Sequence, residues 1–211
     1  MSEQGGTEQV VSNLLTLDEL RARRGAEAPE RWSLAAIRGR LIELSARGAS
    51  GTLTAAVELV AEAQAQSEPV AWLTPGTGTF YPPDVADSGV DLEALVVVRA
   101  PDATSIARAA ERLLRSGAFG LVVLELGDKV DLSMQIQGRL VTLAQTHDAA
   151  IVCLTEKAGD TSSLGSLVSL RAEALRVREH GEFAVTLRAL KDKRRGPGWA
   201  HTIKRRGPAG L

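Results

Sequence analysis

The sequence is poor in cysteine and in aromatic residues, and each scarcity excludes something. A single cysteine among 211 residues cannot form an internal disulfide. Only 3% of the residues are aromatic while 44% are hydrophobic, so Ala, Val and Leu have to build the core. Such a composition favours helices packed on a buried sheet. Cys153 lies in an apolar run (149–154), and we expect it to be a core residue and not a nucleophile.

Long apolar runs are also missing. No stretch approaches the roughly 18 uninterrupted apolar residues of a membrane-spanning helix. The first six residues lack the basic and apolar regions of a signal peptide, and we expect a cytoplasmic protein without a membrane segment. His147, His180 and His201 are dispersed, with no Cys or carboxylate at ligand spacing, so neither a metal site nor a cofactor is expected.

Charge is distributed unevenly along the chain. Residues 188–211 hold eight Lys and Arg and one Asp, a charge of +7, while the remaining 17 cations and 25 anions give −8. The excess suggests an acidic partner, nucleic acid or protein, for a basic tail assigned to residues 191–211; a solvated tail is the alternative. We expect Gly196-Pro197-Gly198 to separate its end from the sheet. The candidate partner-binding residues of this tail are Lys191, Lys193, Arg194, Arg195, Trp199, Lys204, Arg205 and Arg206.

The amino-terminal segment, residues 1–30, predicts a polar tail, a short docking helix and a linker. Thr16-Leu-Asp-Glu19 is a capping box. The helix that it begins has an apolar edge formed by Leu14, Leu17 and Leu20, which can dock on another protein or fold back on its own domain.

Alternating strand and helix patterns over residues 31–190 predict an α/β domain. The expected strands are Leu41–Ser45, Val70–Leu73, Ala94–Arg99, Gly120–Leu126 and Ala150–Thr155. The expected helices are Gly51–Gln66, Pro83–Ser88, Ala103–Ser116 and Leu132–His147. Apolar strands between helices favour a parallel sheet covered on both faces. Leu167–Arg178 and Phe183–Lys191 alternate in polarity around a turn, which predicts an antiparallel hairpin at the C-terminal edge of the sheet.

A phosphate-binding loop that has lost its working residues lies between the first strand and the first long helix. The motif requires G-x-x-x-x-G-K-[ST]. Here Ala46 stands at the first glycine, Thr52 replaces the lysine and Leu53 replaces the hydroxyl that holds magnesium. No cation is left to neutralise phosphate charge. The remnant of the loop consists of Gly48, Ser50, Gly51 and Thr52.

The order and spacing of these segments, over residues 38–199, resemble the RecA core, and more closely the ImuA family, the RecA-like members of bacterial mutagenesis cassettes. Residues 39–44 are similar to the strand that enters the phosphate loop. Residues 113–127 are similar to the Walker B segment, with Glu125 at the acidic position. Residues 190–197 resemble the basic strand end of that core. The resemblance implies a RecA-like fold and a role in DNA-damage-induced mutagenesis.

Three departures from the family bear on activity. Active members carry a catalytic Glu soon after the second strand, but residues 74–83 contain no acid and Asp84 comes later. The segment that follows Glu125 is too short for a first DNA-binding loop. The second such loop has shrunk to Glu156–Gly165, whose acids would repel phosphate. We therefore expect no enzyme activity.

The function expected from the sequence is that of a non-catalytic RecA-like accessory protein in SOS mutagenesis and translesion synthesis. The resemblance implies RecA and the polymerase-like subunit of the cassette as partners, with self-association as a further contact and DNA contact through the tail. One alternative is an ATPase with a rebuilt site, in which Arg47 or Arg40 is the phosphate cation. A second alternative is a DNA-binding module that uses the tail.

Overall fold

The structure, a computed structural model, describes residues 32–206 apart from residues 79, 129, 131, 180 and 181. The described residues belong to a compact unit that begins at Trp32. The docking helix expected to carry Leu14, Leu17 and Leu20 lies outside the described residues and stays a prediction.

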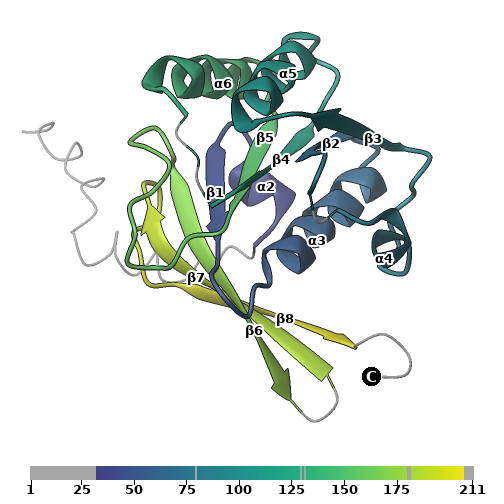
Figure 1. Cartoon of the computed structure of the whole chain (residues 1–211), viewed down its shortest axis with the longest axis vertical. Helices are drawn as coiled ribbons and strands as arrows, with labels where there is room; N and C mark the ends of the chain where they lie inside the picture. The colour runs from purple at the N-terminus through teal and green to yellow at the C-terminus, as the bar shows by residue number, and fades with distance from the viewer. Residues whose placement is uncertain (1–31, 79, 129, 131, 180–181, 207–211) are drawn as a thin grey trace, which may run out of the picture. The chain divides into compact units, whose positions relative to one another are not determined.

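The described strands form one sheet in the order β3-β2-β4-β5-β1-β6-β7-β8 (Figure 1). Their bounds are β1 Leu41–Ser45, β2 Val70–Pro75, β3 Leu95–Ala100, β4 Leu121–Gly127, β5 Ala150–Thr155, β6 Leu170–Glu179, β7 Glu182–Asp192 and β8 Ala200–Arg206. Pairing is parallel from β3 through to β6 and antiparallel between β6, β7 and β8. The expected α/β fold, a parallel sheet with an antiparallel C-terminal hairpin, is confirmed.

Helices cover both faces of the sheet (Figure 1). Their bounds are α2 Leu34–Ile37, α3 Thr52–Ala65, α4 Pro82–Ala86, α5 Ala103–Arg115 and α6 Met134–Thr146. Buried side chains of α2, α3 and α4 pack in one apolar cluster, and those of α5 and α6 pack in another. Because successive residues of a strand point to opposite faces, Ile42 and Leu44 join the first cluster while Leu41 joins the second.

The C-terminal strand β8 was not expected from the sequence. Residues 200–206 pair with β7, and Ile203, opposite Val185, is buried in the core. Gly196 and Gly198 have φ values of 82° and 99°, which glycine adopts without strain and which let the chain reverse. The expectation that Gly196-Pro197-Gly198 separates the tail from the sheet is therefore wrong, because this segment turns the chain back into the sheet.

Two expectations about the interior can be compared with the structure. Cys153 is fully buried in β5, as expected of a core residue, and its burial together with the nearby Glu43 raises the pKa of the thiol. Among the described residues, every helix is too short or too polar to cross a lipid bilayer.

Candidate functional site

A hollow in the described unit lies at the carboxyl ends of the parallel strands, where ligands bind in open α/β sheets. It is a pocket of about 1190 Å³. The β1–α3 loop, the amino-terminal half of α3, the region around α4, the end of β4 and the tips of β6, β7 and β8 contribute its walls. Trp72 and Phe80 form part of its apolar lining, with ring centroids 4.8 Å apart.

The β1–α3 loop is closed by β6. The Gly51 N–H donates to the carbonyl of Ala174 at 2.9 Å, and the Arg176 N–H donates to the carbonyl of Ala49 at 2.9 Å. Ser50 donates its N–H to a carbonyl inside the loop. A phosphate-binding loop needs such N–H groups to point at the anion. In this loop the N–H groups of Ser50 and Gly51 are already used by the chain itself.

Packing explains why glycine occupies position 51. A Cβ added to Gly51 would lie 2.5 Å from Cγ1 of Val185, so β7 leaves no room for a side chain. The next residue, Thr52, is buried, and its hydroxyl lies 2.9 Å from that of Ser50. The packing of β7 therefore requires glycine at position 51. Thr52, which stands at the position of the motif lysine, is itself buried.

Glu125, the Walker-B-like residue, is held by the neighbouring strand. It is buried at the end of β4, and Oε2 accepts hydrogen bonds from the Thr74 hydroxyl at 2.6 Å and from Nε1 of Trp72 at 3.4 Å. A Cβ on Gly78 would lie 3.0 Å from the same oxygen, so the turn after β2 packs closely over the carboxylate. Glu125 thus stabilises the β2–β4 contact.

The charge of the pocket does not suit a polyphosphate. Six carboxylates, three arginines and no lysine are among its described lining residues: Glu58, Asp84, Asp87, Glu125, Asp128 and Glu156, with Arg47, Arg176 and Arg205. Arg205 is paired with Glu58, and Arg176 lies 5.0 Å above the ring of Phe183. The excess of acid raises the energy of a bound polyanion.

The segment after β5, which stands where the RecA family has its second DNA-binding loop, is tied to the sheet. Glu43 in the middle of β1 is completely buried. Its carboxylate accepts hydrogen bonds from the Ser163 hydroxyl and the Leu164 N–H, both at 2.8 Å, and from the Thr155 hydroxyl at 3.0 Å. Lys157 lies 3.6 Å from the same carboxylate.

Arg171 completes this buried cluster from β6, the strand that pairs with β1. Its guanidinium donates to the carbonyl of Ala158 at 2.8 Å and to that of Thr161, and Nε lies 3.9 Å from Glu43. Such a pair is favourable only when hydrogen bonds satisfy both ions, as they do here. The expectations from the sequence did not include Glu43 or Arg171. The available signal was Glu43, a charged residue inside the apolar strand β1; Arg171 gave no such signal, because β6 alternates apolar and charged residues.

At the other end of β1, Asp192 organises the start of the segment expected to be a tail. Its Oδ1 lies 2.6 Å from the Arg40 guanidinium, and its Oδ2 accepts from Nε1 of Trp199 at 3.1 Å. Burial alone would raise the pKa of Asp192, but hydrogen bonds from the Arg194 backbone, Arg40 and Trp199 hold it below its ordinary value. Arg195 lies 5.3 Å above the Trp199 ring.

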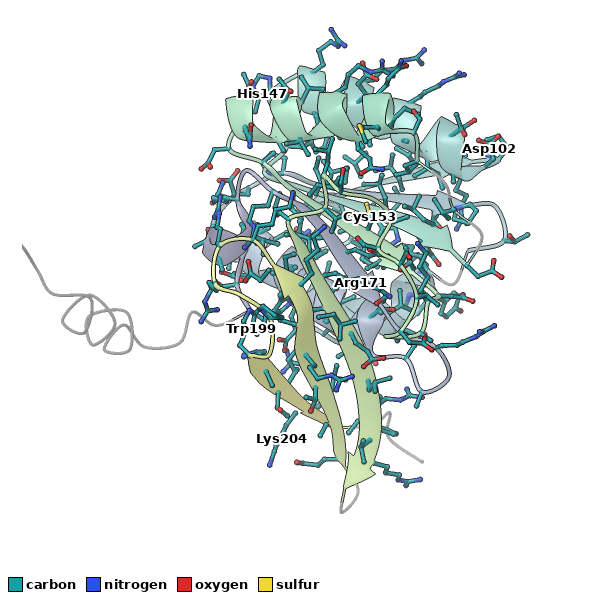
Figure 2. The ribbon with its side chains drawn as sticks, turned by 90° about the vertical axis from the view of Figure 1, so that its left-hand side faces the viewer. Asp102, His147, Cys153, Arg171, Trp199 and Lys204 are labelled. Carbon is teal, nitrogen blue, oxygen red and sulfur yellow. The ribbon has the colours of Figure 1, made fainter. Side chains whose placement is uncertain are left out.

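The basic residues of the tail do not gather in one patch. Lys191 and Lys193 donate to carbonyls of the β5–β6 segment, and Arg194 donates to the carbonyl of Arg38. Partial burial, followed by the charge of Lys193, lowers the pKa of Lys191. Figure 2 shows Lys204 well separated from Trp199. Arg205 reaches α3, and Arg206 ends β8.

Two further expectations concern cations. Arg40 is buried in its ion pair with Asp192 at the amino end of β1, so it cannot reach the pocket, and that part of the ATPase alternative is wrong. Arg47 is exposed and lines the pocket.

Within the described ranges, no group of three or more His, Cys, Asp or Glu side chains is placed to hold a metal ion.

Comparisons with known proteins agree with this architecture. No protein-family model matches the chain. Over 116 residues the chain is 29% identical to Protein RecA of Fusobacterium nucleatum, a match that covers 50% of this chain and 30% of that protein. Over 118 residues it is 30% identical to Protein RecA of Picosynechococcus sp. and to that of Chlorobium chlorochromatii, covering 51% of this chain and 34% and 33% of those proteins.

The fold is RecA-like. The chain spans about a third of the length of these RecA proteins, so the similarity supports a distant relationship and no finer assignment. In this RecA-like unit the loop that resembles a phosphate loop is closed by β6, and the segment after β5 is held by Glu43 and Arg171.

Proposed function

We propose that this chain is a RecA-like accessory protein that acts by binding other proteins and does not turn over nucleotide. The observation that supports this most is the closed β1–α3 loop, whose Gly51 N–H donates to Ala174. Thr52 and Leu53 supply neither the cation nor the magnesium ligand of a working loop. The acid-rich pocket adds repulsion against a triphosphate.

The biological setting that we infer is DNA-damage-induced mutagenesis and translesion synthesis in the cytoplasm. Similarity to RecA supports a RecA-related role, and the sequence resemblance to the ImuA family suggests the mutagenesis cassette. The partners in this proposal are RecA and the polymerase-like subunit of the cassette, with self-association and DNA contact as secondary possibilities.

The surface best suited to a RecA-type partner is the β3 edge of the sheet. β3 forms one edge of the sheet, and Val96 and Val97 are exposed on it. An exposed apolar edge strand accepts a further strand from another chain, since its backbone groups are available for pairing. By pairing through its β3 edge, this chain would cover the polymerisation surface of a RecA protomer, and no ATP hydrolysis would be needed.

Nucleotide binding is the first test. Titration calorimetry with Mg-ATP should give no measurable binding, and a phosphate-release assay should give no turnover, because loss of a single electrostatic contact costs roughly 10²–10³ in rate and several are absent here. Glu125→Gln is the diagnostic variant and Glu156→Gln, which also lines the pocket, is its control. Turnover that only Glu125→Gln abolishes would overturn the proposal and favour the ATPase, which could use Arg47 as its phosphate cation.

Partner binding is the second test. Val97→Lys and Leu175→Lys form a matched pair, because both side chains are 38% exposed, one on the β3 edge and one on β6. Interferometry against immobilised RecA should show weaker binding for Val97→Lys alone, by about tenfold or more, as expected when an interface core residue is charged. Equal binding by both variants would exclude the β3 edge, and absence of binding by the unmodified protein would exclude RecA as the partner.

A further inference from the structure

The two helical layers of this unit carry opposite charge. Between Arg47 and Arg99 the sequence contains seven acidic residues and no Lys, Arg or His, and this stretch supplies α3 and α4. The helices α5 and α6, on the other face of the sheet, contain four arginines, one glutamate and no lysine. A local charge of +3 therefore lies on a unit whose opposite layer is acidic.

Three of these arginines form a stripe along α5. Arg108, Arg112 and Arg115 follow the i, i+4, i+7 spacing of one helix face, and all three are exposed. The buried residues of α5, which include Ile106 and Leu114, lie on the opposite face against the sheet. Figure 2 shows nitrogen-tipped side chains projecting from this helical layer, away from the sheet.

The layer already holds one carboxylate between its two helices. Glu111 accepts from Nη2 of Arg115 at 2.7 Å and from Nε of Arg139 at 3.0 Å. These hydrogen bonds, Arg115 first, hold the pKa of Glu111 below its ordinary value against the opposing effect of burial. The guanidinium groups of Arg115 and Arg139 are thus oriented to bind a carboxylate. Arg108 and Arg112 lie on the same helix, and neither forms an ion pair with a described acid. The pKa of Asp102, the N-cap residue of α5, is lowered chiefly by the hydrogen bond from the Ser105 N–H and to a lesser extent by the charge of Arg108.

We propose that this arginine face, formed by Arg108, Arg112, Arg115 and Arg139, binds a carboxylate-rich segment of a different protein. The proposal does not depend on the function proposed above. Its first basis is charge complementarity, and its second is that Arg and Met are enriched at protein interfaces while Lys is depleted. All the cations of α5 and α6 are arginines, and Met134, the first residue of α6, is 68% exposed.

Two other occupants fit the arginine face less well. Single-stranded nucleic acid is gripped by cations interleaved with aromatic side chains, but the exposed aromatic residue of the described unit is Tyr81, beside α4 in the other layer. A second copy would have to offer its acidic layer. There Glu58, Glu62 and Glu68 already have partners in their own chain, namely Arg205, the Leu34 N–H and Arg38.

The experiment uses a fluorescent poly-glutamate peptide as the probe, titrated with the full chain in low and high salt. Arg108→Gln/Arg112→Gln should weaken binding by about tenfold or more, since two charge contacts are lost. The control Arg47→Gln/Arg178→Gln removes the same charge from exposed positions outside α5 and α6 and should change affinity by less than about twofold. Glu111→Gln should strengthen binding, because it releases Arg115 and Arg139 for the probe.

Four outcomes would overturn the proposal. Equal loss in the control pair would mean that net charge alone drives binding. No gain for Glu111→Gln would mean that the orientation of the arginines is irrelevant. Tighter binding of an oligothymidylate, lost in Arg108→Gln/Arg112→Gln, would assign the face to nucleic acid. A dimer mass in light scattering that returns to a monomer in the same variant would assign the face to a second copy.

Discussion

The carboxyl end of the sheet and the α5–α6 layer use polar groups in opposite ways. At the sheet end the chain binds itself: β6 takes the Gly51 N–H, while Glu43 and Arg171 hold the segment after β5. On the α5–α6 layer Arg108 and Arg112 point away from the core and form no ion pair with a described acid. In the loop that resembles a nucleotide site, backbone N–H groups are therefore bonded within the chain, whereas the α5–α6 layer directs its charge outward.

The largest effect is expected where the sheet end depends on a buried carboxylate. Glu43→Ala leaves Arg171 and Lys157 without their anion, and breaking a buried pair in this way costs about 3–5 kcal/mol. Denaturant unfolding should report this loss, and proteolysis should cleave within residues 156–165. Glu111→Ala, which removes an exposed pair from the other layer, should cost at most about 1 kcal/mol and is the control. Similar losses for the two variants would mean that the buried Glu43 contributes no more to stability than the exposed contacts of Glu111.

A pH-dependent loss is expected at the amino end of β1. The folded pKa of Asp192 lies below its ordinary value of 3.8, so its stabilisation is present above that pH and is lost as pH falls through the folded pKa. Asp192→Asn should lower the unfolding free energy by about 1.5–3 kcal/mol at pH 7, and the difference from wild type should shrink below pH 3.8. An unchanged difference down to pH 2 would exclude this role; Asp87→Asn, at an exposed position, is the control.

A packing effect is expected at the closed loop. Gly51→Ala places a methyl group against Val185, and overpacking of this kind costs about 1–3 kcal/mol. Because Val185 is buried and its truncation has a cost of its own, Gly51→Ala/Val185→Ala should be less destabilised than the sum of the two single variants. Gly76→Ala, with open space around its Cβ position, should be neutral in the same thermal unfolding assay. A neutral Gly51→Ala would mean that β7 does not enforce the glycine.

The smallest effect on stability is expected on the arginine face. Arg112→Gln removes an exposed charge without emptying a cavity, so the unfolding free energy should change by less than about 0.5 kcal/mol. Chemical denaturation should be measured for this variant and for Glu43→Ala side by side, so that the two losses of unfolding free energy can be compared directly. A loss above about 1 kcal/mol would show that the arginine supports the fold, since exposed charges seldom contribute that much.

Much of the fold could be predicted from local patterns. Apolar runs between amphipathic helices define a parallel sheet, and Leu41–Ser45 and Ala150–Thr155 have the bounds expected for β1 and β5. The strand β8 was missed, because a run such as Lys204-Arg205-Arg206 carries no apolar periodicity. Its pairing depends on the burial of Ile203 opposite Val185, which is a long-range contact.

The absence of the motif lysine can be read from the sequence, since Thr52 stands in its place, and the alternation of strands and helices follows from hydrophobic periodicity. Three features became visible only in the folded chain: β6 closes the loop at Gly51, Trp199 donates a hydrogen bond to Asp192, and α5 and α6 present their arginines together. The physical reason is that these contacts join residues far apart in the chain. Spacing within one segment indicates which face of a helix or strand a residue occupies, but it does not indicate which residues of a distant segment will contact it.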